Sequence, residues 1–264
     1  MTWLTELCEL KRRSARLRAQ GFSEAGMLAE VKSLEPARTF SAALKGDGAP
    51  AVIAEIKYAS PTHGPFRRTE DVGTLAAGYS RAGAAALSIL TDGRHFEGSL
   101  ENLAPARGSS RIPVLCKDFI LTTYQVVEAR YHQADAVLLI ARILSRSEVA
   151  ELAACAMELG MEPLIELHGV EDLKKIEGTR PTMVGVNHRN LETLEIDRSL
   201  SRAMAPRMPP GAARVAESGL STAADLKEMA QLGYDAVLVG SALMSSPDPA
   251  GALKELLGAF HAPH

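Results

Sequence analysis

The sequence predicts an α/β protein with a (β/α)8 barrel and an N-terminal helical extension. From residue 51 onward, short runs rich in valine, isoleucine and leucine alternate with longer segments of helical periodicity, which is typical of a parallel sheet built from strand–helix units. There are eight such runs, and eight parallel strands can close into a barrel that has no sheet edges. The length of 264 residues also suits a single barrel domain.

Each predicted strand precedes a helical segment or a polar loop. The expected strands are residues 51–57, 86–91, 112–117, 135–140, 162–167, 182–187, 214–217 and 236–240. The main helical candidates are residues 69–82, 123–131, 145–159, 171–176, 221–232 and 250–260. An open doubly wound sheet is the competing fold, but it normally carries a glycine-rich turn after its first strand, where this chain has Tyr-Ala-Ser-Pro. The strand count and the missing turn favour the barrel.

Residues 1–50 are surplus to a barrel of residues 51–264. Helical patterns cover residues 4–18 and 23–33, and a linker containing proline and glycine follows them. No composition shift marks a second independent domain. We therefore expect the segment to pack on the barrel as an extension that covers one of its ends, as a lid or a plug.

The charge balance argues against nucleic-acid binding. A formal net charge of -3 and a pI near 6.2 do not provide the basic field that displaces counterions from phosphates. A local basic group, which could contact RNA or an anionic ligand, consists of Lys11, Arg12, Arg13, Arg16 and Arg18. A solvated helix face is the commoner explanation of such a group, and we expect it here.

The sequence favours a soluble protein of the reducing cytoplasm. Cys8, Cys116 and Cys155 form no C-x-x-C pair, so neither a disulfide framework nor a structural zinc site is supported. Glu6 and Glu9 interrupt the apolar residues near the N-terminus, unlike a secretion signal. No stretch approaches the roughly 18 apolar residues of a membrane span, so we expect no membrane association.

Ionisable side chains recur where the predicted strands end. Alternation places Glu55 and Lys57 on one face of the first strand, and Lys117, Glu166 and Glu217 come at or near the ends of the third, fifth and seventh. A barrel gathers these ends at one rim, where active sites lie. One charge there is commonly a solvated terminus, but five together predict mutual pairing or a charged ligand. Neighbouring groups can shift such acids and bases toward neutral pKa values.

The seventh and eighth loops, Glu-Ser-Gly-Leu-Ser at 217–221 and Gly-Ser-Ala at 240–242, predict a phosphate site. In barrels these two loops commonly bind phosphate through backbone N–H groups that glycine leaves accessible. Gly219 and Gly240 could instead merely turn the chain. Their joint position favours a small phosphorylated substrate.

Other catalytic motifs are missing. The seven histidines show no H-E-x-x-H or similar spacing, so we expect no metal. Glu166 and His168 could in principle hold one ion, but a surface or supporting role is the commoner one for His168 and His188. No G-x-S-x-G elbow supports a hydrolase triad. Cys116 points away from Lys117 and is expected to pack outside the barrel.

Seven motifs follow one another in order along nearly the whole chain. They are Glu-Ile-Lys-Tyr-Ala-Ser-Pro-Thr-His-Gly at 55–64, Leu-Ser-Ile-Leu-Thr-Asp at 87–92, Phe-Glu-Gly-Ser at 96–99, Lys-Asp-Phe-Ile at 117–120, Leu-Ile-Glu-Leu-His at 164–168, Gly-Val-Asn-His-Arg-Asn-Leu-Glu-Thr at 185–193 and Ala-Glu-Ser-Gly at 216–219. Together with Arg-Thr-Phe at 38–40 and the helical extension, they resemble the indole-3-glycerol phosphate synthase family. Any one motif alone would be weak evidence for the family, whereas the ordered set of motifs is specific.

The resemblance implies a reaction and a set of site residues. The reaction is the decarboxylating and dehydrating ring closure of 1-(2-carboxyphenylamino)-1-deoxyribulose 5-phosphate to indole-3-glycerol phosphate in tryptophan biosynthesis, without cofactor or metal. The implied catalytic residues are Lys117 as general acid with Glu55, Lys57 and Glu166 around it. The implied substrate-binding residues are Ser60, Asn187, Arg189, Glu217 and Ser218, with Gly219, Gly240 and Ser241 contacting the phosphate. Other enzymes of tryptophan biosynthesis are possible partners.

The chemistry agrees with these strand ends, since a lysine of lowered pKa could protonate the carbonyl oxygen during ring closure. Members of the family often have other residues where this chain has Tyr58, His63 and Asn190, which leaves extra cationic contacts to the substrate carboxylate open. Another phosphate-binding barrel, such as an isomerase or a thiazole synthase, is the alternative enzyme. A barrel that binds sugar phosphates without turnover is the non-catalytic alternative.

Overall fold

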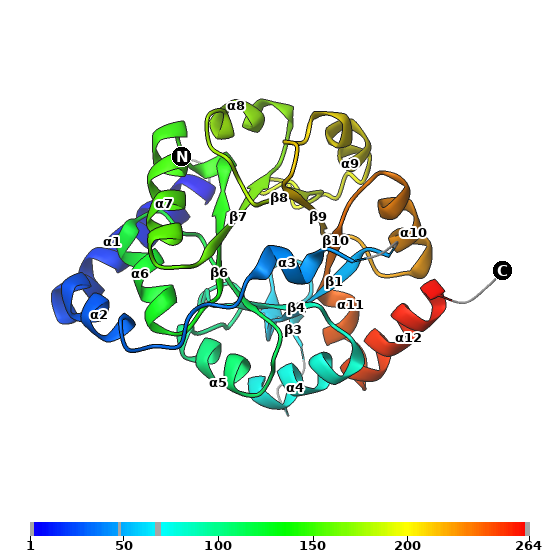
Figure 1. Ribbon diagram of the computed structural model, residues 1–264, viewed down its shortest axis with the longest axis horizontal. Helices are drawn as coiled ribbons and strands as arrows, with labels where there is room; N and C mark the ends of the chain where they lie inside the picture. Colours follow the sequence, from blue (N-terminus) through cyan, green and yellow to red (C-terminus); the bar gives the residue numbers. More distant parts are fainter. Residues whose placement is uncertain (1–2, 47–48, 67–69, 262–264) are drawn as a thin grey trace.

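The computed structural model describes residues 3–46, 49–66 and 70–261. Within these residues eight parallel strands close into a barrel with helices around it (Figure 1). The strands are β1 (Ala51–Ile56), β4 (Ala86–Leu90), β5 (Val114–Lys117), β6 (Ala136–Ile140), β7 (Glu162–Leu167), β8 (Met183–Asn187), β9 (Ala213–Glu217) and β10 (Ala236–Val239). Neighbours in the barrel are neighbours in the chain, and β10 closes it against β1. The predicted barrel is confirmed, with strand ends shifted by one or two residues.

The helices outside the barrel match the predicted ones except where they are short. They are α4 (Val72–Ala82), α5 (Leu103–Gly108), α6 (Thr123–Tyr131), α7 (Arg146–Glu158), α8 (Leu173–Ile176), α9 (Ser199–Met204), α10 (Ala223–Gln231), α11 (Ser241–Met244) and α12 (Pro249–His261). The sequence analysis missed α5, α9 and α11, because four to six residues hold too little of the helical period to be distinguished from a loop. Helix α4 begins at Val72 because Asp71 caps it, accepting from the Thr74 N–H at 2.9 Å; the predicted start at residue 69 lies outside the described residues.

Strand alternation divides the apolar residues into two cores. One face of the strands fills the barrel interior with side chains such as Ile53, Leu115 and Leu164. The other face packs against the helices, and there Cys116 is buried as expected. Because the interior is filled, the ligand site must lie at an end of the barrel and not along its axis.

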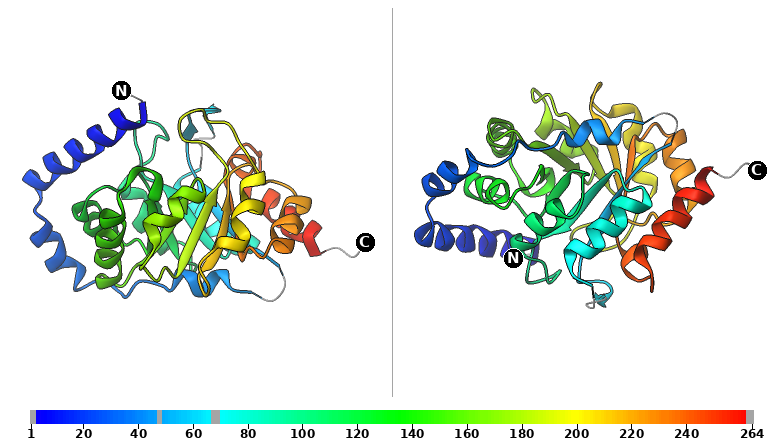
Figure 2. Two further views of the ribbon diagram at one scale, coloured as in Figure 1. Left: turned by 90° about the horizontal axis from the view of Figure 1, so that it is seen from above. Right: turned by 60° about the horizontal axis from the view of Figure 1, so that its bottom comes forward.

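The segment before β1 contacts both ends of the barrel. It contains α1 (Trp3–Gly21), α2 (Glu24–Val31) and α3 (Phe40–Leu44). Phe40 and Leu44 of α3 are fully buried in the interior core, and α3 closes the end at which the strands begin. The start of α1 lies at the opposite end (Figure 2, left). The sequence analysis expected only a linker where α3 forms, and it expected the segment to cover one end.

The basic group on α1 attaches that helix to the barrel. Lys11 forms ion pairs with Asp92, at 2.7 Å, and with Asp118. Farther along the helix, Arg18 pairs with the buried carboxylate of Glu128 at 2.6 Å, and Arg12 pairs with Glu148 on α7. The expectation of a merely solvated face is therefore wrong for three of the five residues, because carboxylates on the barrel helices and loops face them.

Membrane-spanning helices and clusters of metal-binding side chains are both absent from the described residues. None of the helices among them is long and apolar enough to cross a membrane. Within the same part of the chain, no three His, Cys, Asp or Glu side chains are grouped so that they could hold a metal ion.

Candidate active site

Five charged side chains meet at the end of the barrel where the strands finish. Lys57 Nζ lies 2.7 Å from Glu55 Oε1 at the end of β1. Lys117 Nζ, from the end of β5, lies 3.1 Å from Glu166 Oε2 on β7 and 3.4 Å from Glu217 Oε2 on β9. The carboxylates of Glu166 and Glu217 are 1% exposed. The structure therefore brings together the five ionisable residues that the sequence placed at strand ends.

The two glutamates beside Lys117 differ in protonation. Burial acts to raise the pKa of Glu166, but the charges of Lys117 and His168 lower it to about 2. Burial raises the pKa of Glu217, and the negative charge of Glu166 raises it further, well above the ordinary 4.5. Neither oxygen of Glu217 has a hydrogen-bond partner among the described residues, so no hydrogen bond offsets the cost of burying its charged form. Glu217 therefore keeps its proton to a much higher pH than Glu166 does.

Lys117 is held in its charged form. Burial acts to lower its pKa, but the carboxylates, Glu166 foremost, outweigh burial and raise the pKa above the ordinary value of 10.5. The sequence analysis expected a lysine of lowered pKa. That expectation is wrong, because the sequence could not show how many carboxylates surround the ammonium group.

Two glycines make room for the charged side chains. A Cβ atom on Gly185 of β8 would stand 2.2 Å from Glu217 Oε1. A Cβ atom on Gly240 would stand 2.3 Å from Glu55 Oε1 and 3.0 Å from Lys57 Nζ. All three distances are below van der Waals contact, so any side chain at either position would displace an ionisable group. The sequence analysis assigned Gly240 to the phosphate site alone, and the structure adds this second requirement.

A pocket of about 310 Å3 joins the charged group to the seventh and eighth loops. Its lining includes Arg189, Ser218, Gly219, Gly240 and Ser241. Ser218 and Gly219 both have positive φ, 70° and 72°, so the turn after β9 has a left-handed backbone that is strained for the serine. The predicted phosphate-loop residues thus line one pocket with the predicted catalytic group.

His188 contacts the main chain of this strained turn. One ring nitrogen, Nδ1, lies 2.7 Å from the carbonyl oxygen of Ser218, and Nε2 lies 2.6 Å from Ser201 Oγ. The residue is 2% exposed. His188 is therefore a buried supporting residue, one of the two roles that the sequence analysis left open for it.

An apolar wall faces the charged group, and the sequence analysis missed it. Two smaller pockets, of about 90 and 120 Å3, contain Lys57 and Arg189 on their polar side. Their apolar lining includes Trp3, Pro61, Phe96, Phe119 and Leu191. Phe96 and Phe119 belong to the motifs at 96–99 and 117–120. Trp3 lies near the N-terminus, and only the packing of α1 on the barrel brings it to the site.

The remaining predicted residues also lie at this end of the barrel. Asn187, the last residue of β8, pairs in register with Glu217, and its Oδ1 accepts from the Arg189 N–H at 3.0 Å. The Arg189 guanidinium donates to the Leu194 carbonyl at 2.8 Å. Ser60 lies in the short β2 strand (Ala59–Ser60), which pairs with β3 (Gly64–Pro65), and it lines the 90 Å3 pocket. None of the site residues predicted from the sequence is placed elsewhere.

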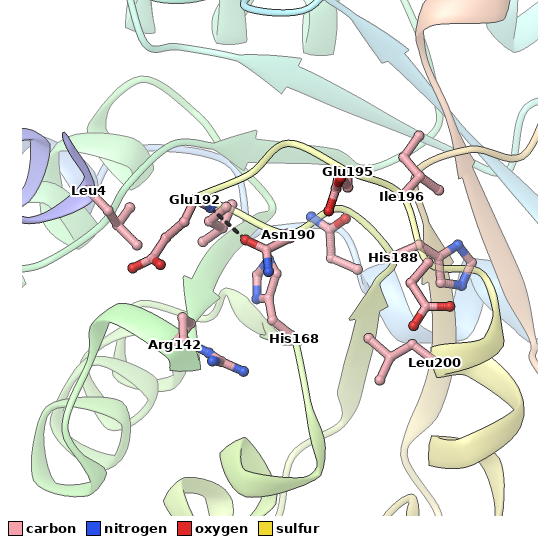
Figure 3. A pocket seen from close by; sticks show the side chains of 12 residues that line it. Leu4, Arg142, His168, His188, Asn190, Glu192, Glu195, Ile196 and Leu200 are labelled. Atoms are coloured by element: carbon pink, nitrogen blue, oxygen red, sulfur yellow. Dashed lines mark hydrogen bonds between the residues drawn. The ribbon is translucent and has the colours of Figure 1, made fainter. Parts of the chain in front are cut away.

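A larger pocket of about 760 Å3 adjoins the site on the side of β7 and β8 (Figure 3). Arg142, His168 and Asn187 line it, together with the loop after β8 and Leu4 of α1. The His168 side chain is 5% exposed, and its Nε2 lies 3.2 Å from Glu166 Oε1. The sequence analysis considered an ion ligand, a surface residue and a supporting residue for His168, and the burial of its side chain shows that the surface role is wrong.

The comparison with known families decides between the enzyme classes that share such a barrel. A family model described as indole-3-glycerol phosphate synthase matches residues 4–256. The chain belongs to the indole-3-glycerol phosphate synthase family. Members of this family are carboxy-lyases of tryptophan biosynthesis, so the family assignment favours the predicted ring closure over an isomerase, a thiazole synthase or a non-catalytic barrel.

Relatives within the indole-3-glycerol phosphate synthase family match most of the chain. "Indole-3-glycerol phosphate synthase 1" of Streptomyces coelicolor is 41% identical over 97% of this chain and 93% of its own length. The synthase of Azoarcus sp. (strain BH72) is 41% identical over 97% of this chain and 98% of its own length. That of Mycobacteroides abscessus is 44% identical over 83% of this chain and 80% of its own.

Solved structures with little sequence identity share the fold. A 3-hexulose-6-phosphate synthase superposes with a TM-score of 0.63 at 17% identity, covering 80% of this chain and 99% of that chain. A thiamine phosphate pyrophosphorylase from Pyrococcus furiosus gives a TM-score of 0.61 at 16% identity, covering 84% and 98%. These likenesses support the barrel fold of this family member and say nothing about its reaction.

Proposed function

We propose that Lys117 is the general acid with which this chain closes the indole ring of 1-(2-carboxyphenylamino)-1-deoxyribulose 5-phosphate. The chain is a carboxy-lyase by family, and its product is indole-3-glycerol phosphate. The observation that carries the assignment of Lys117 is its position: Nζ lies between Glu166 and Glu217, at 3.1 and 3.4 Å, where the charged pocket meets the apolar wall. The ammonium groups of Lys117 and Lys57 both line this pocket, and Lys117 is the one that lies between two glutamates.

Ring closure requires a proton on the carbonyl oxygen. The aromatic carbon that bears the carboxylate attacks the sugar carbonyl carbon, and the carbonyl oxygen becomes a hydroxyl group as it takes a proton. Lys117 is charged at neutral pH because its pKa is raised, so it carries the proton that this step consumes. The transfer is favourable because the oxygen that develops negative charge is far more basic than an amine. Carbon dioxide then leaves, and the ring takes up the electron pair of the broken bond.

Dehydration requires an acid and a base in the same pocket. The hydroxyl group must leave as water, and a proton must leave the neighbouring carbon. Glu166, with a pKa of about 2, is ionised and can accept a proton, while Glu217 retains one to higher pH. We assign the base to Glu166 and a substrate-orienting role to Glu217. Lys57, paired with Glu55, is the second ammonium group available as an acid.

The lining of the pockets suggests how the substrate lies. The phosphate is assigned to the pocket that contains Gly219, Gly240 and Ser241, with Ser218 beside them. The aromatic ring is assigned to the wall that includes Phe96 and Phe119, because burying an aromatic face against apolar side chains removes both from water. Asn187, Arg189 and Ser60 line the pockets between these two regions, and we assign their polar groups to the carboxylate and hydroxyl groups of the substrate.

We place the enzyme in the cytoplasm, with the other enzymes of tryptophan biosynthesis as possible partners. The three cysteines are free thiols, which fits a reducing compartment. Nothing among the described contacts identifies a partner surface. Fractionation of cells with the protein at its native level would test the location, and recovery in the membrane fraction would contradict it.

The deciding experiment for Lys117 is single-turnover ring closure in the Lys117→Met variant, which keeps the length of the side chain and removes the proton. Losing a general acid costs about 10²- to 10⁴-fold, so kcat should fall at least about a hundredfold. The assay follows indole fluorescence in metal-free buffer, after dialysis of the enzyme against a chelator, with circular dichroism to verify the fold. Near-normal closure would eliminate Lys117 as the acid and point to Lys57. Wild-type activity restored only by added metal would contradict the proposed chemistry.

A further inference from the structure

His168 contacts the carboxylate of Glu166 on the side opposite Lys117. It comes directly after β7, two residues beyond Glu166, and its side chain is 5% exposed. Glu166 Oε2 faces Lys117 Nζ at 3.1 Å, and Glu166 Oε1 faces His168 Nε2 at 3.2 Å. One carboxylate is thus held between an ammonium group and an imidazole ring.

Among the residues that the structure describes, the imidazole ring has no other polar partner. Neither ring nitrogen makes a hydrogen bond of good geometry, although both are buried. A buried polar group without a partner costs about 1–3 kcal/mol, so the fold alone would favour an apolar residue at this position. On its far side the ring lines the 760 Å3 pocket with Arg142 and Asn190 (Figure 3). Glu166 Oε1, at 3.2 Å from Nε2, is an acceptor that can use an imidazole N–H.

We propose that His168 is a positioning residue for Glu166: its Nε2–H holds Glu166 Oε1, so that Oε2 stays directed at Lys117 and the reacting atoms. The inference rests on the proposed function, in which Glu166 acts as the base. A carboxylate can rotate about its last bond, and a rotated Glu166 would lose the 3.1 Å contact with Lys117. Fixing one oxygen fixes the other, since the two belong to one rigid planar group.

The charges around the ring are consistent with a neutral imidazole. Burial lowers the pKa of His168, the carboxylates of Glu166 and Asp172 oppose this, and Lys117 and Arg142 add to it. A neutral ring carries one N–H, and the carboxylate of Glu166 favours that hydrogen on Nε2. Nδ1 is then the acceptor. The backbone N–H of His168, which donates to Asp172 Oδ2 at 2.8 Å, fixes the main chain from which the ring projects.

Three substitutions separate positioning from packing. His168→Gln places an amide N–H close to the position of Nε2, His168→Asn places one close to the position of Nδ1, and His168→Leu has none. We expect the Gln variant to keep kcat within about threefold of wild type, while the Asn and Leu variants lose about tenfold or more, with KM changed less than about threefold in all three. His132→Leu, which removes a partly buried histidine at the end of α6 whose charged neighbours are Glu128 and Glu101, is the control and should keep kcat.

A measurement on the resting wild-type enzyme tests the contact without turnover. In ¹⁵N-histidine NMR, with the His168 resonance identified by its absence in His168→Gln, we expect a protonated Nε2, an unprotonated Nδ1 and a changed signal in Glu166→Gln. A ring protonated on Nδ1 instead of Nε2, or a His168 resonance that is unchanged in Glu166→Gln, would overturn the proposal. So would equal kcat losses in all three His168 variants, which would indicate packing alone, or full activity of His168→Leu. Failure of the wild type to close the ring would instead count against the proposed function.

Discussion

Gly240 and Glu55 approach so closely that no side chain fits between them: a Cβ atom on Gly240 would stand 2.3 Å from Glu55 Oε1. Gly240 follows β10, and Glu55 belongs to β1, the strand that closes the barrel against β10. The same Cβ would stand 3.0 Å from Lys57 Nζ. The position of the Glu55–Lys57 pair therefore depends on the same glycine that lines the predicted phosphate pocket.

This contact predicts the effect of a single methyl group. Gly240→Ala should displace Glu55 and Lys57 and lower kcat by about tenfold or more, with weaker binding of inorganic phosphate as a second effect. Gly258→Ala on α12 is the matched control, because a Cβ there meets nothing within 4 Å. Steady-state kinetics and calorimetry with phosphate provide the two measurements. Unchanged kcat in Gly240→Ala would show that the pair tolerates displacement.

The raised pKa of Glu217 predicts a pH-dependent stability. Between the ordinary pKa of 4.5 and its raised value, folded Glu217 holds a proton that the unfolded chain has released, so its contribution to stability falls as pH rises through that window. Glu217→Gln cannot titrate and does not show this fall. We expect the Tm of Glu217→Gln minus that of wild type to increase from pH 5 to pH 8. A difference that stays constant across that range would contradict the protonated state.

The ion pairs of Lys11 predict that α1 supports the site. Lys11→Met leaves the carboxylates of Asp92 and Asp118 without their cation, and breaking a buried pair in this way costs about 3–5 kcal/mol, less where solvent reaches the groups. Because Trp3 on the same helix lines the site, KM should rise as well. Arg13→Met, on an exposed position of the same helix, is the control. Equal KM and Tm in the two variants would show that the docking of α1 is dispensable.

The buried side chains of α3 predict different results for two truncations. Removing residues 1–21 takes away α1 and should raise KM in a barrel that still folds. Removing residues 1–45 also takes away Phe40 and Leu44, and losing the ring of Phe40 alone costs about 3–5 kcal/mol. The longer truncation should therefore melt at a much lower temperature than the shorter one. Equal Tm values would show that the interior does not need α3. Thermal melting followed by circular dichroism measures the Tm of both truncated proteins.

Much of the fold and most of the candidate site could be predicted because they follow local rules. Short runs of apolar residues identify the strands, and the ends of parallel strands in a barrel lie at one rim, so Glu55, Lys117 and Glu166 could be grouped from the sequence alone. The short helices α5 and α9 could not be recognised, since each holds fewer than two turns. The aromatic wall could be found only in part, because Trp3 reaches the site through the docking of a distant helix.

The sequence by itself determined the barrel, the rim on which the chemistry lies and the identities of the groups there, because these depend on periodicity and on residue order. The tertiary structure decided the state of those groups. Lys117 has a raised pKa and Glu217 a retained proton because two carboxyl groups, those of Glu166 and Glu217, are buried at 3.1 and 3.4 Å from one ammonium group. Electrostatic energies depend on the distances between charged groups and on their burial, and the amino-acid sequence alone specifies neither quantity.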